Sequence, residues 1–158
     1  MTKYESLLDS AKNEDLFVEE TPLFSGTRIK GLYYDKHIAI NKDLETDSDK
    51  ACILAEELGH HYTTVGNILD QGKTENRKQE LKARAWAYDK LVGLRGIINA
   101  HNSKCQSVAE MADYLCVTED FIVDAIQYYK SKYGVYAKID NYIIFFEPVL
   151  GVFELYSQ

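Results

Sequence analysis

The stretch that decides how this chain is interpreted is Leu54-Ala55-Glu56-Glu57-Leu58-Gly59-His60-His61-Tyr62. On a helix, residues i and i+4 lie one above the other on the same face, so Glu56 and His60 point the same way and can hold one ion. Glu57 lies about 100° round the helix axis from Glu56. That position puts a carboxylate beside the ion, where a general base can take the proton from an attacking water.

A catalytic zinc needs a third protein ligand and an open coordination position. Glu80, on the next expected helix, is the best supplier of that ligand. Its helix face continues through Ala83 and Ala87, whose small side chains allow a close approach to the first helix. The spacing therefore predicts a zinc site on Glu56, His60 and Glu80.

Other interpretations of the same stretch stay open. A solvated polar face would also contain acids and histidines, because both are common on exposed helices. His61 could pair with Glu57 at i+4 as a substitute ligand, but Leu58 would then occupy the position of the base. We therefore expect His61 to be packed or hydrogen-bonded. Tyr62 is expected in the core, and the alternative is a phenol that assists an oxyanion.

The pattern of apolar residues and turn signals predicts an α+β fold. A stripe of Leu54, Leu58, Tyr62 and Val65 places the central helix against the core, and Thr46 is its expected N-cap. The elements are helices over 3–12, 46–65 and 75–94, two or three short strands over 17–41, a loop over 66–73, two helices around a turn at 116–118, and C-terminal strands over 135–156.

Length and composition limit the class of protein. A chain of 158 residues is one ordinary domain with room for a small appendage. Cys52, Cys105 and Cys116 form no CxxC pair, which argues against a disulfide framework or a zinc knuckle and fits a reduced cytoplasm. No apolar run is long enough for a membrane span, and the N-terminus lacks a secretory pattern, so we expect a cytoplasmic protein without membrane contact.

Charge argues against nucleic acid as a partner. The net charge is −7, and neutralising phosphates requires clustered Lys and Arg. The segment 107–127 has a helix-turn-helix pattern but contains no Lys or Arg. It holds five acids: Glu110, Asp113, Glu119, Asp120 and Asp124. We therefore expect this segment to pack on the core or to dock a protein partner, and a partner with a basic surface is compatible with the charge.

The run ILAEELGHHYT, preceded by HIAIN and followed by ELKARAWA, resembles the ImmA/IrrE family of metallopeptidases. Members show a strand reading I-x-L/I-N, a helix with HELGH, and Glu-x-x-Ala-x-x-aromatic-Ala on the next helix. The last pattern corresponds here to Glu80, Ala83, Trp86 and Ala87. The resemblance covers roughly residues 28–95, and more loosely the chain to Gly134, where AEMADYLCVTEDFI is similar to a helix-turn-helix-like segment that often follows.

This resemblance implies a zincin-like helix pair with short flanking strands, a helix-turn-helix-like appendage and C-terminal strands. The implied domains are a metallopeptidase core over 1–100 and, over 101–158, the appendage and strands packed on it. Members encoded on phages and mobile elements commonly act on helix-turn-helix repressors. Residue by residue, the resemblance makes His60 and Glu80 metal ligands and Glu57 the general base.

The chain departs from the family pattern at three points. Glu56 stands where the first histidine ligand belongs, Arg84 stands where relatives usually carry Asn, and the Met-Pro that follows the second helix is missing. A carboxylate can bind zinc at about 2.0–2.2 Å. With Glu56, the ligand set is more anionic and harder than the usual one with two histidines, which makes Mn²⁺ a more plausible metal. We also expect the metal-bound water to be less acidic, which would slow hydrolysis.

Two functions follow from these observations. The first is a metal-dependent endopeptidase that acts on a helix-turn-helix repressor-type regulator of a phage or mobile element. The second is a non-cleaving antirepressor, or binding module, that retains the zincin scaffold. The replacement at Glu56 keeps the second interpretation open. A DNA-binding regulator is disfavoured by the acidic segment.

Overall fold

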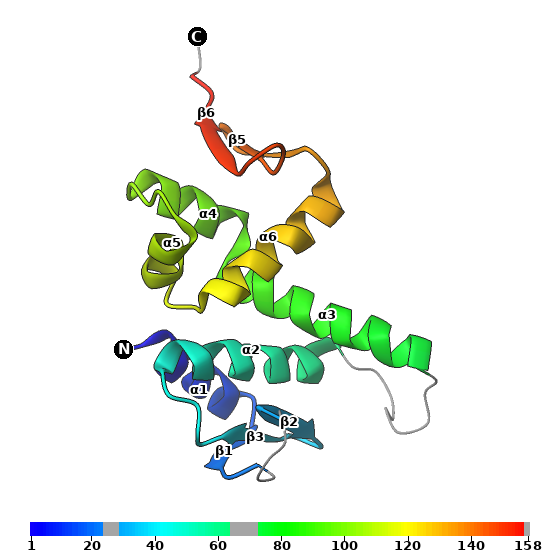
Figure 1. Cartoon of the computed structure of the whole chain (residues 1–158). Coiled ribbons are helices and arrows are strands. Elements are labelled where there is room, and N and C mark those ends of the chain that lie inside the picture. Colours follow the sequence, from blue (N-terminus) through cyan, green and yellow to red (C-terminus); the bar gives the residue numbers. More distant parts are fainter. Residues whose placement is uncertain (24–28, 64–72, 157–158) are drawn as a thin grey trace. The chain divides into compact units, whose positions relative to one another are not determined.

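The computed structural model of the chain describes residues 1–23, 29–63 and 73–156. The described elements alternate between helices and two small sheets, which confirms the α+β class (Figure 1). In chain order they are α1 (Lys3–Asn13), β1 (Phe17–Thr21), β2 (Gly31–Tyr34), β3 (His37–Asn41), α2 (Asp47–Thr63), α3 (Lys73–Leu91), α4 (Gly93–Asn102), α5 (Val108–Leu115), α6 (Glu119–Tyr133), β4 (Tyr136–Ile139), β5 (Tyr142–Phe145) and β6 (Gly151–Glu154).

The chain divides into two compact units, Met1–Ala87 and Tyr88–Gln158. The change of unit falls within α3, whose residues 73–87 belong to the first unit. The division expected from the sequence lay at residue 100 and was a functional one, between a metallopeptidase core and an appendage. The two compact units do not test that functional division, which stays a prediction.

The first sheet has the strand order β1-β3-β2, with β1 parallel and β2 antiparallel to β3. Asp35 and Lys36 connect β2 to β3, and both have positive φ, as two-residue hairpin turns of the primed types require. Along β3, Ile38 and Ile40 are buried, whereas His37, Ala39 and Asn41 are not. This is the period of two expected of a strand with one buried face. The strands predicted over 17–41 are thus confirmed.

The helices α1 and α2 cover one face of this sheet (Figure 1). Leu54 and Leu58 of α2 are buried, as the stripe predicted. The Thr46 hydroxyl accepts from the Asp49 backbone N–H at 3.0 Å, which confirms the N-cap. The placement of Tyr62 in the core is wrong, because 43% of the residue is exposed. The predicted helix end at Val65 and the loop over 66–72 lie outside the described residues.

The second long helix differs from its predicted bounds. It begins at Lys73, and it ends at Leu91 rather than Leu94. Gly93 has a φ of +66°, a backbone conformation that glycine adopts without strain, so the chain changes direction there and α4 begins. Within the described ranges, no helix is long and apolar enough to cross a membrane.

The second unit packs α4, α5 and α6 against an antiparallel sheet of order β4-β5-β6. Thr118 caps α6 by accepting from the Phe121 backbone N–H at 3.1 Å, and Cys116 takes the left-handed conformation that ends α5. The predicted helices around residues 116–118 and the C-terminal strands are confirmed. The side chains of Ala137, Ile144 and Val152 face the helices and are buried.

Candidate active site

The helices α2 and α3, which carry the candidate ligands His60 and Glu80, approach each other closely at Gly59. A Cβ added at Gly59 would overlap the backbone carbonyl oxygen of Ala83 and lie 3.0 Å from the Ala83 Cα. Ala83 and Ala87 are fully buried, as their small side chains predicted. The backbones can therefore come closer here than larger side chains would allow.

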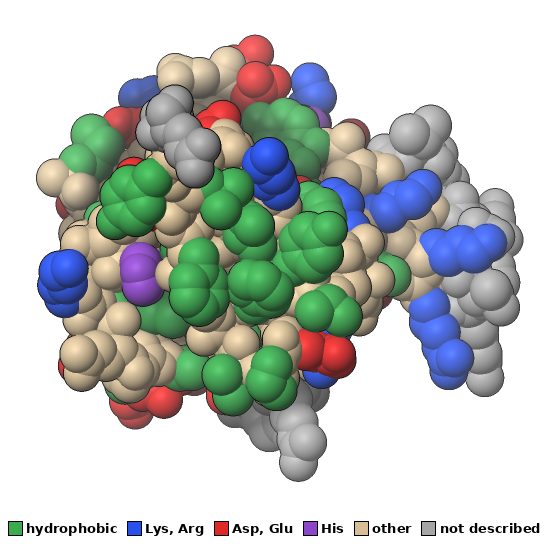
Figure 2. Space-filling model, turned by 90° about the horizontal axis from the view of Figure 1, so that it is seen from above, with side chains coloured by type: hydrophobic (Ala, Val, Ile, Leu, Met, Phe, Trp, Pro, Cys, Tyr) green, Lys and Arg blue, Asp and Glu red, His purple; other side chains and the backbone are tan. Residues whose placement is uncertain are grey.

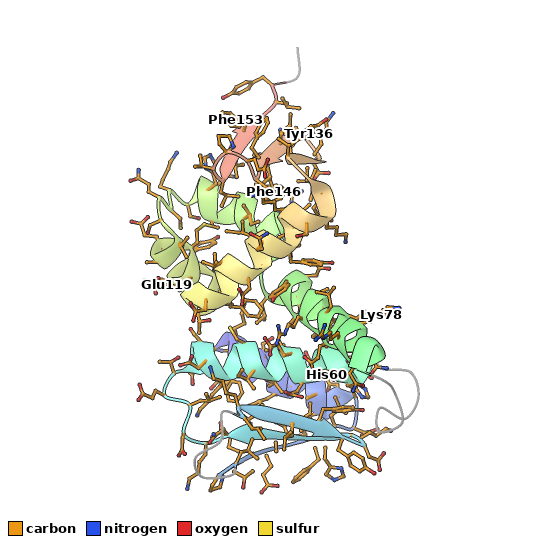
Figure 3. The ribbon with its side chains drawn as sticks, turned by 45° about the vertical axis from the view of Figure 1, so that its right-hand side comes forward. His60, Lys78, Glu119, Tyr136, Phe146 and Phe153 are labelled. Carbon is orange, nitrogen blue, oxygen red and sulfur yellow. The ribbon has the colours of Figure 1, made fainter. Side chains whose placement is uncertain are left out.

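This close approach brings His60 and Glu80 together. The His60 Nε2 lies 3.0 Å from the Glu80 Oε1, across the two helices. The His60 side chain is 15% exposed and the Glu80 side chain is 53% exposed, so the pair opens to solvent on the α3 side. Figure 3 shows His60 near the C-terminal end of α2, beside α3. The expected meeting of Glu80 with His60 is confirmed.

Glu57 lies beside this pair and is covered by strand β2. A Cβ added at Gly31 would lie 2.9 Å from the Glu57 Oε1 and 2.6 Å from the Ile53 Cγ2. A Cβ at this position would displace these two side chains, so the glycine lets β2 pass close to the carboxylate and helps to shield Glu57 from water. Glu57 thus lies beside the His60–Glu80 pair, and its role as a general base stays a prediction.

The charges of the four site residues act on one another. Burial raises the pKa of Glu57 to about 7; His60 opposes this rise, while Glu56 and Glu80 add to it. The hydrogen bond to Glu80 raises the pKa of His60 against the opposing effect of burial, and the neighbouring carboxylates add to the rise. The same hydrogen bond lowers the pKa of Glu80. Three carboxylates therefore act on one imidazole, and Arg84, whose Nε lies 3.9 Å from the Glu80 Oε2, offsets part of their charge.

His61 and Tyr62 occupy other sides of α2. The His61 Nδ1 lies 2.9 Å from the Tyr33 hydroxyl on β2, so the prediction of a hydrogen-bonded histidine is confirmed. Tyr62 stacks on Trp86 with ring centroids 5.0 Å apart and an interplanar angle of 24°. Trp86 thus contacts α2 through Tyr62, which is 43% exposed.

The donor atoms fit a divalent cation in part. In a tetrahedral zinc site with bond lengths near 2 Å, neighbouring ligand atoms are about 3.3 Å apart, close to the 3.0 Å between His60 and Glu80. The same distance also suits a direct ion pair. Among the described side chains, no group of three or more His, Cys, Asp and Glu is arranged to hold a metal ion. Two of the predicted ligands are therefore adjacent, and Glu56 does not join them in that arrangement.

Sequence reasoning did not assign a role to Gly31, Tyr33 or Gly59. An isolated glycine within a strand or helix pattern signals a close approach of another backbone, and both glycines carry that signal. Tyr33 is separated from Gly31 by one residue, so it lies on the same strand face and reaches α2 one turn further along. No local signal would have paired it with His61.

A cavity of about 200 Å³ lies elsewhere, in the second unit, between α4, α5 and the beginning of β6. Its lining includes His101, Cys105 and Ser107 and no carboxylate. It lacks the grouped acids and imidazole of the His60 cluster, so we base the candidate site on that cluster.

Comparisons with family models, with curated proteins and with solved structures returned no match for this chain.

Proposed function

We propose that this chain is a zincin-like, metal-dependent endopeptidase of the cytoplasm that acts on a helix-turn-helix repressor-type regulator. The observation that carries the proposal is the His60–Glu80 contact of 3.0 Å beside the shielded Glu57. The resemblance of the stretch 53–63 and of Glu80, Ala83, Trp86 and Ala87 to the ImmA/IrrE pattern supplies the substrate class. Partner and substrate remain a proposal that rests on this resemblance.

In this proposal His60 and Glu80 would hold the metal, and Glu56 would complete the ligand set by turning toward them when the cation binds. The excess of carboxylates supports a divalent cation, either zinc or the harder manganese. When bound, the cation supplies Lewis-acid activation of water and of the peptide carbonyl. Glu57 takes a proton from the attacking water at its carboxylate and returns it to the leaving amine. Without a metal the pKa of Glu57 is about 7, and a bound cation would lower it, which favours the ionised form that a general base needs.

A second function is favoured by one observation. His60 and Glu80 satisfy each other directly in an ion pair, an arrangement that needs no metal to keep α2 and α3 together. The chain can then serve as a binding module that sequesters a repressor without cutting it. Incubation with a panel of purified helix-turn-helix repressors separates the two: fragments support the peptidase, whereas an intact complex supports the binding module.

Metal binding should depend on the paired residues. We expect His60→Ala and Glu80→Ala to weaken zinc or manganese binding by at least about 10-fold, because each removes one ligand of few. Isothermal titration and elemental analysis of protein purified without chelator measure the effect. His101→Ala is the matched control, since His101 is an exposed histidine outside the cluster. Equal metal binding in all four proteins would contradict the ligand assignment.

A further inference from the structure

The sheet of the second unit has an exposed aromatic face. The registers place Tyr136 opposite Phe145 and Ile143 opposite Phe153, on the side turned away from the buried Val152. The ring centroids of Tyr136 and Phe145 are 5.9 Å apart, and those of Phe145 and Phe153 are 5.5 Å apart. We call these four side chains the aromatic face. Figure 3 labels Tyr136 and Phe153, and hydrophobic side chains gather in the view of Figure 2.

The strand β6 forms one edge of this sheet. The Leu155 backbone N–H donates to the Asn141 carbonyl at 2.6 Å, so residue 155 turns its hydrogen-bonding groups toward β5. In an antiparallel pair these groups alternate in direction along the strand. Phe153 therefore also bonds toward β5, and the backbone groups of Val152 and Glu154 point away from the sheet. No hydrogen bond from the described part of the chain reaches these groups, so they can pair with another strand.

This edge has less protection than the β1 and β4 edges, and in that respect it resembles the β2 edge of the first sheet, which carries no charged residue. Charged side chains commonly keep sheet edges from pairing. The β1 edge of the first sheet carries Glu19 and Glu20, and β4 carries the exposed Lys138. On β6 the charged residue is Glu154, whose carboxylate accepts a hydrogen bond from the Asn141 side chain at 3.2 Å. That charge is turned back onto its own sheet.

The apolar surface around β6 approaches the size of an interface. Phe153 is 59% exposed and Tyr156 is 89% exposed, and Val149 and Leu155 are exposed beside them. With the 150–250 Å² of a full aromatic side chain, these residues and Tyr136 offer on the order of 500 Å² of apolar surface. A stable pair of proteins buries about 800 Å² on each side. The backbone edge and the polar residues around it can supply the remainder.

We propose that β6 pairs with β6 of a second copy of this chain, in antiparallel orientation around a two-fold axis near Phe153. Around a two-fold axis the same surface of each copy contacts the other copy. A strand edge that can pair with itself can therefore form the interface without any other partner. Val152 of each copy lies opposite Glu154 of the other, and their backbone groups form the ladder. The two Phe153 rings lie next to each other on one side of a six-stranded sheet, and the two aromatic faces become continuous.

The mass of the full-length protein in solution tests this pairing. Light scattering should give twice the chain mass of 18.1 kDa from low micromolar concentration upward. Phe153→Lys should make the protein monomeric, because it brings two charges together at the axis. Glu154→Pro should do the same, because it removes an outward backbone N–H and leaves the backbone hydrogen bonds between β6 and β5 in place. Hydrogen exchange at Val152 and Glu154 should slow as the concentration rises.

Phe17→Lys is the matched control. Phe17 is 57% exposed and lies on β1 of the first sheet, so the substitution changes charge and hydrophobicity equally but leaves β6 intact. This variant should remain dimeric. A wild-type protein that stays monomeric up to near-millimolar concentration overturns the pairing. A dimer that survives Phe153→Lys or Glu154→Pro overturns it too, and so does dissociation by Phe17→Lys.

Salt should strengthen this dimer. Each copy carries a net charge of −7, so the copies repel each other at low ionic strength, and added salt screens that repulsion. The apolar contacts at the axis do not weaken on screening. The dimer dissociation constant should therefore fall several-fold between low and physiological salt. A dissociation constant that rises with salt would indicate an interface made of ion pairs and would contradict this one.

Discussion

Glu57→Gln should abolish peptide cleavage while making the metal-free protein more stable. Glutamine has nearly the same shape but cannot accept a proton, so cleavage of a susceptible repressor should fall by about 100-fold or more. Glutamine also stays neutral in a place where a charge is unfavourable. The expected result is therefore a loss of activity that cannot be attributed to loss of the fold.

The stability gain should depend on pH. The folded protein raises the pKa of Glu57 from 4.5 to about 7 through burial, so the fold prefers the protonated acid. Below pH 4.5 both states are protonated and stability is fully present. As pH rises to 7, the unfolded chain ionises first and the wild type loses on the order of 2–3 kcal/mol. Glu57→Gln should not show this loss, so its advantage should grow between pH 4.5 and pH 7 and be complete above pH 7.

Denaturant titrations at pH 5 and pH 8, in the presence of a chelator, measure that difference. Glu19→Gln is the control, because Glu19 is exposed on β1 and the substitution removes the same charge outside the His60 cluster. It should leave cleavage and the pH dependence unchanged. Cleavage at the wild-type rate by Glu57→Gln would reject the general base, and a variant less stable than the wild type at pH 8 would reject the shielded carboxylate.

Gly59→Ala should destabilise the first unit and separate the candidate ligands. The added methyl group would overlap the Ala83 carbonyl, which is backbone and cannot rotate away. Overpacking of this kind costs about 3 kcal/mol, and the better helix propensity of alanine returns about 1 kcal/mol. The net loss in the free energy of unfolding should be about 2 kcal/mol. The shift of α3 should also weaken metal binding, because His60 and Glu80 move apart.

Gly96→Ala is the matched control for that substitution. Gly96 is also a buried helical glycine, but its added Cβ would first meet the Leu115 Cδ2 at 3.4 Å, an ordinary contact with a movable side chain. We expect it to leave stability unchanged or to raise it by up to about 1 kcal/mol. Urea unfolding followed by circular dichroism compares the two. Equal effects of both substitutions would contradict a tight crossing at Gly59.

Local signals predicted most of the elements. The N-cap Thr46 acts as expected because a hydroxyl that accepts from a backbone N–H three residues on is a local interaction. The strand at residues 37–41 could likewise be predicted, because the preference of its residue types for strands is a local property. The break at Gly93 was missed, because a glycine within a helical pattern does not reveal whether the chain will adopt a positive φ. The exposure of Tyr62 was missed because helical spacing does not show where a covering element ends.

At the site, the sequence alone determined which side chains share a face of α2, because the helical period sets their directions: Glu56 with His60, and Glu57 one turn from His61. Only the tertiary structure decided which distant groups these faces meet. The absence of a Cβ at Gly59 and at Gly31 lets α3 and β2 approach α2, which pairs Glu80 with His60 and shields Glu57 from water. Distances between elements depend on how backbones pack, and no period along the chain encodes them.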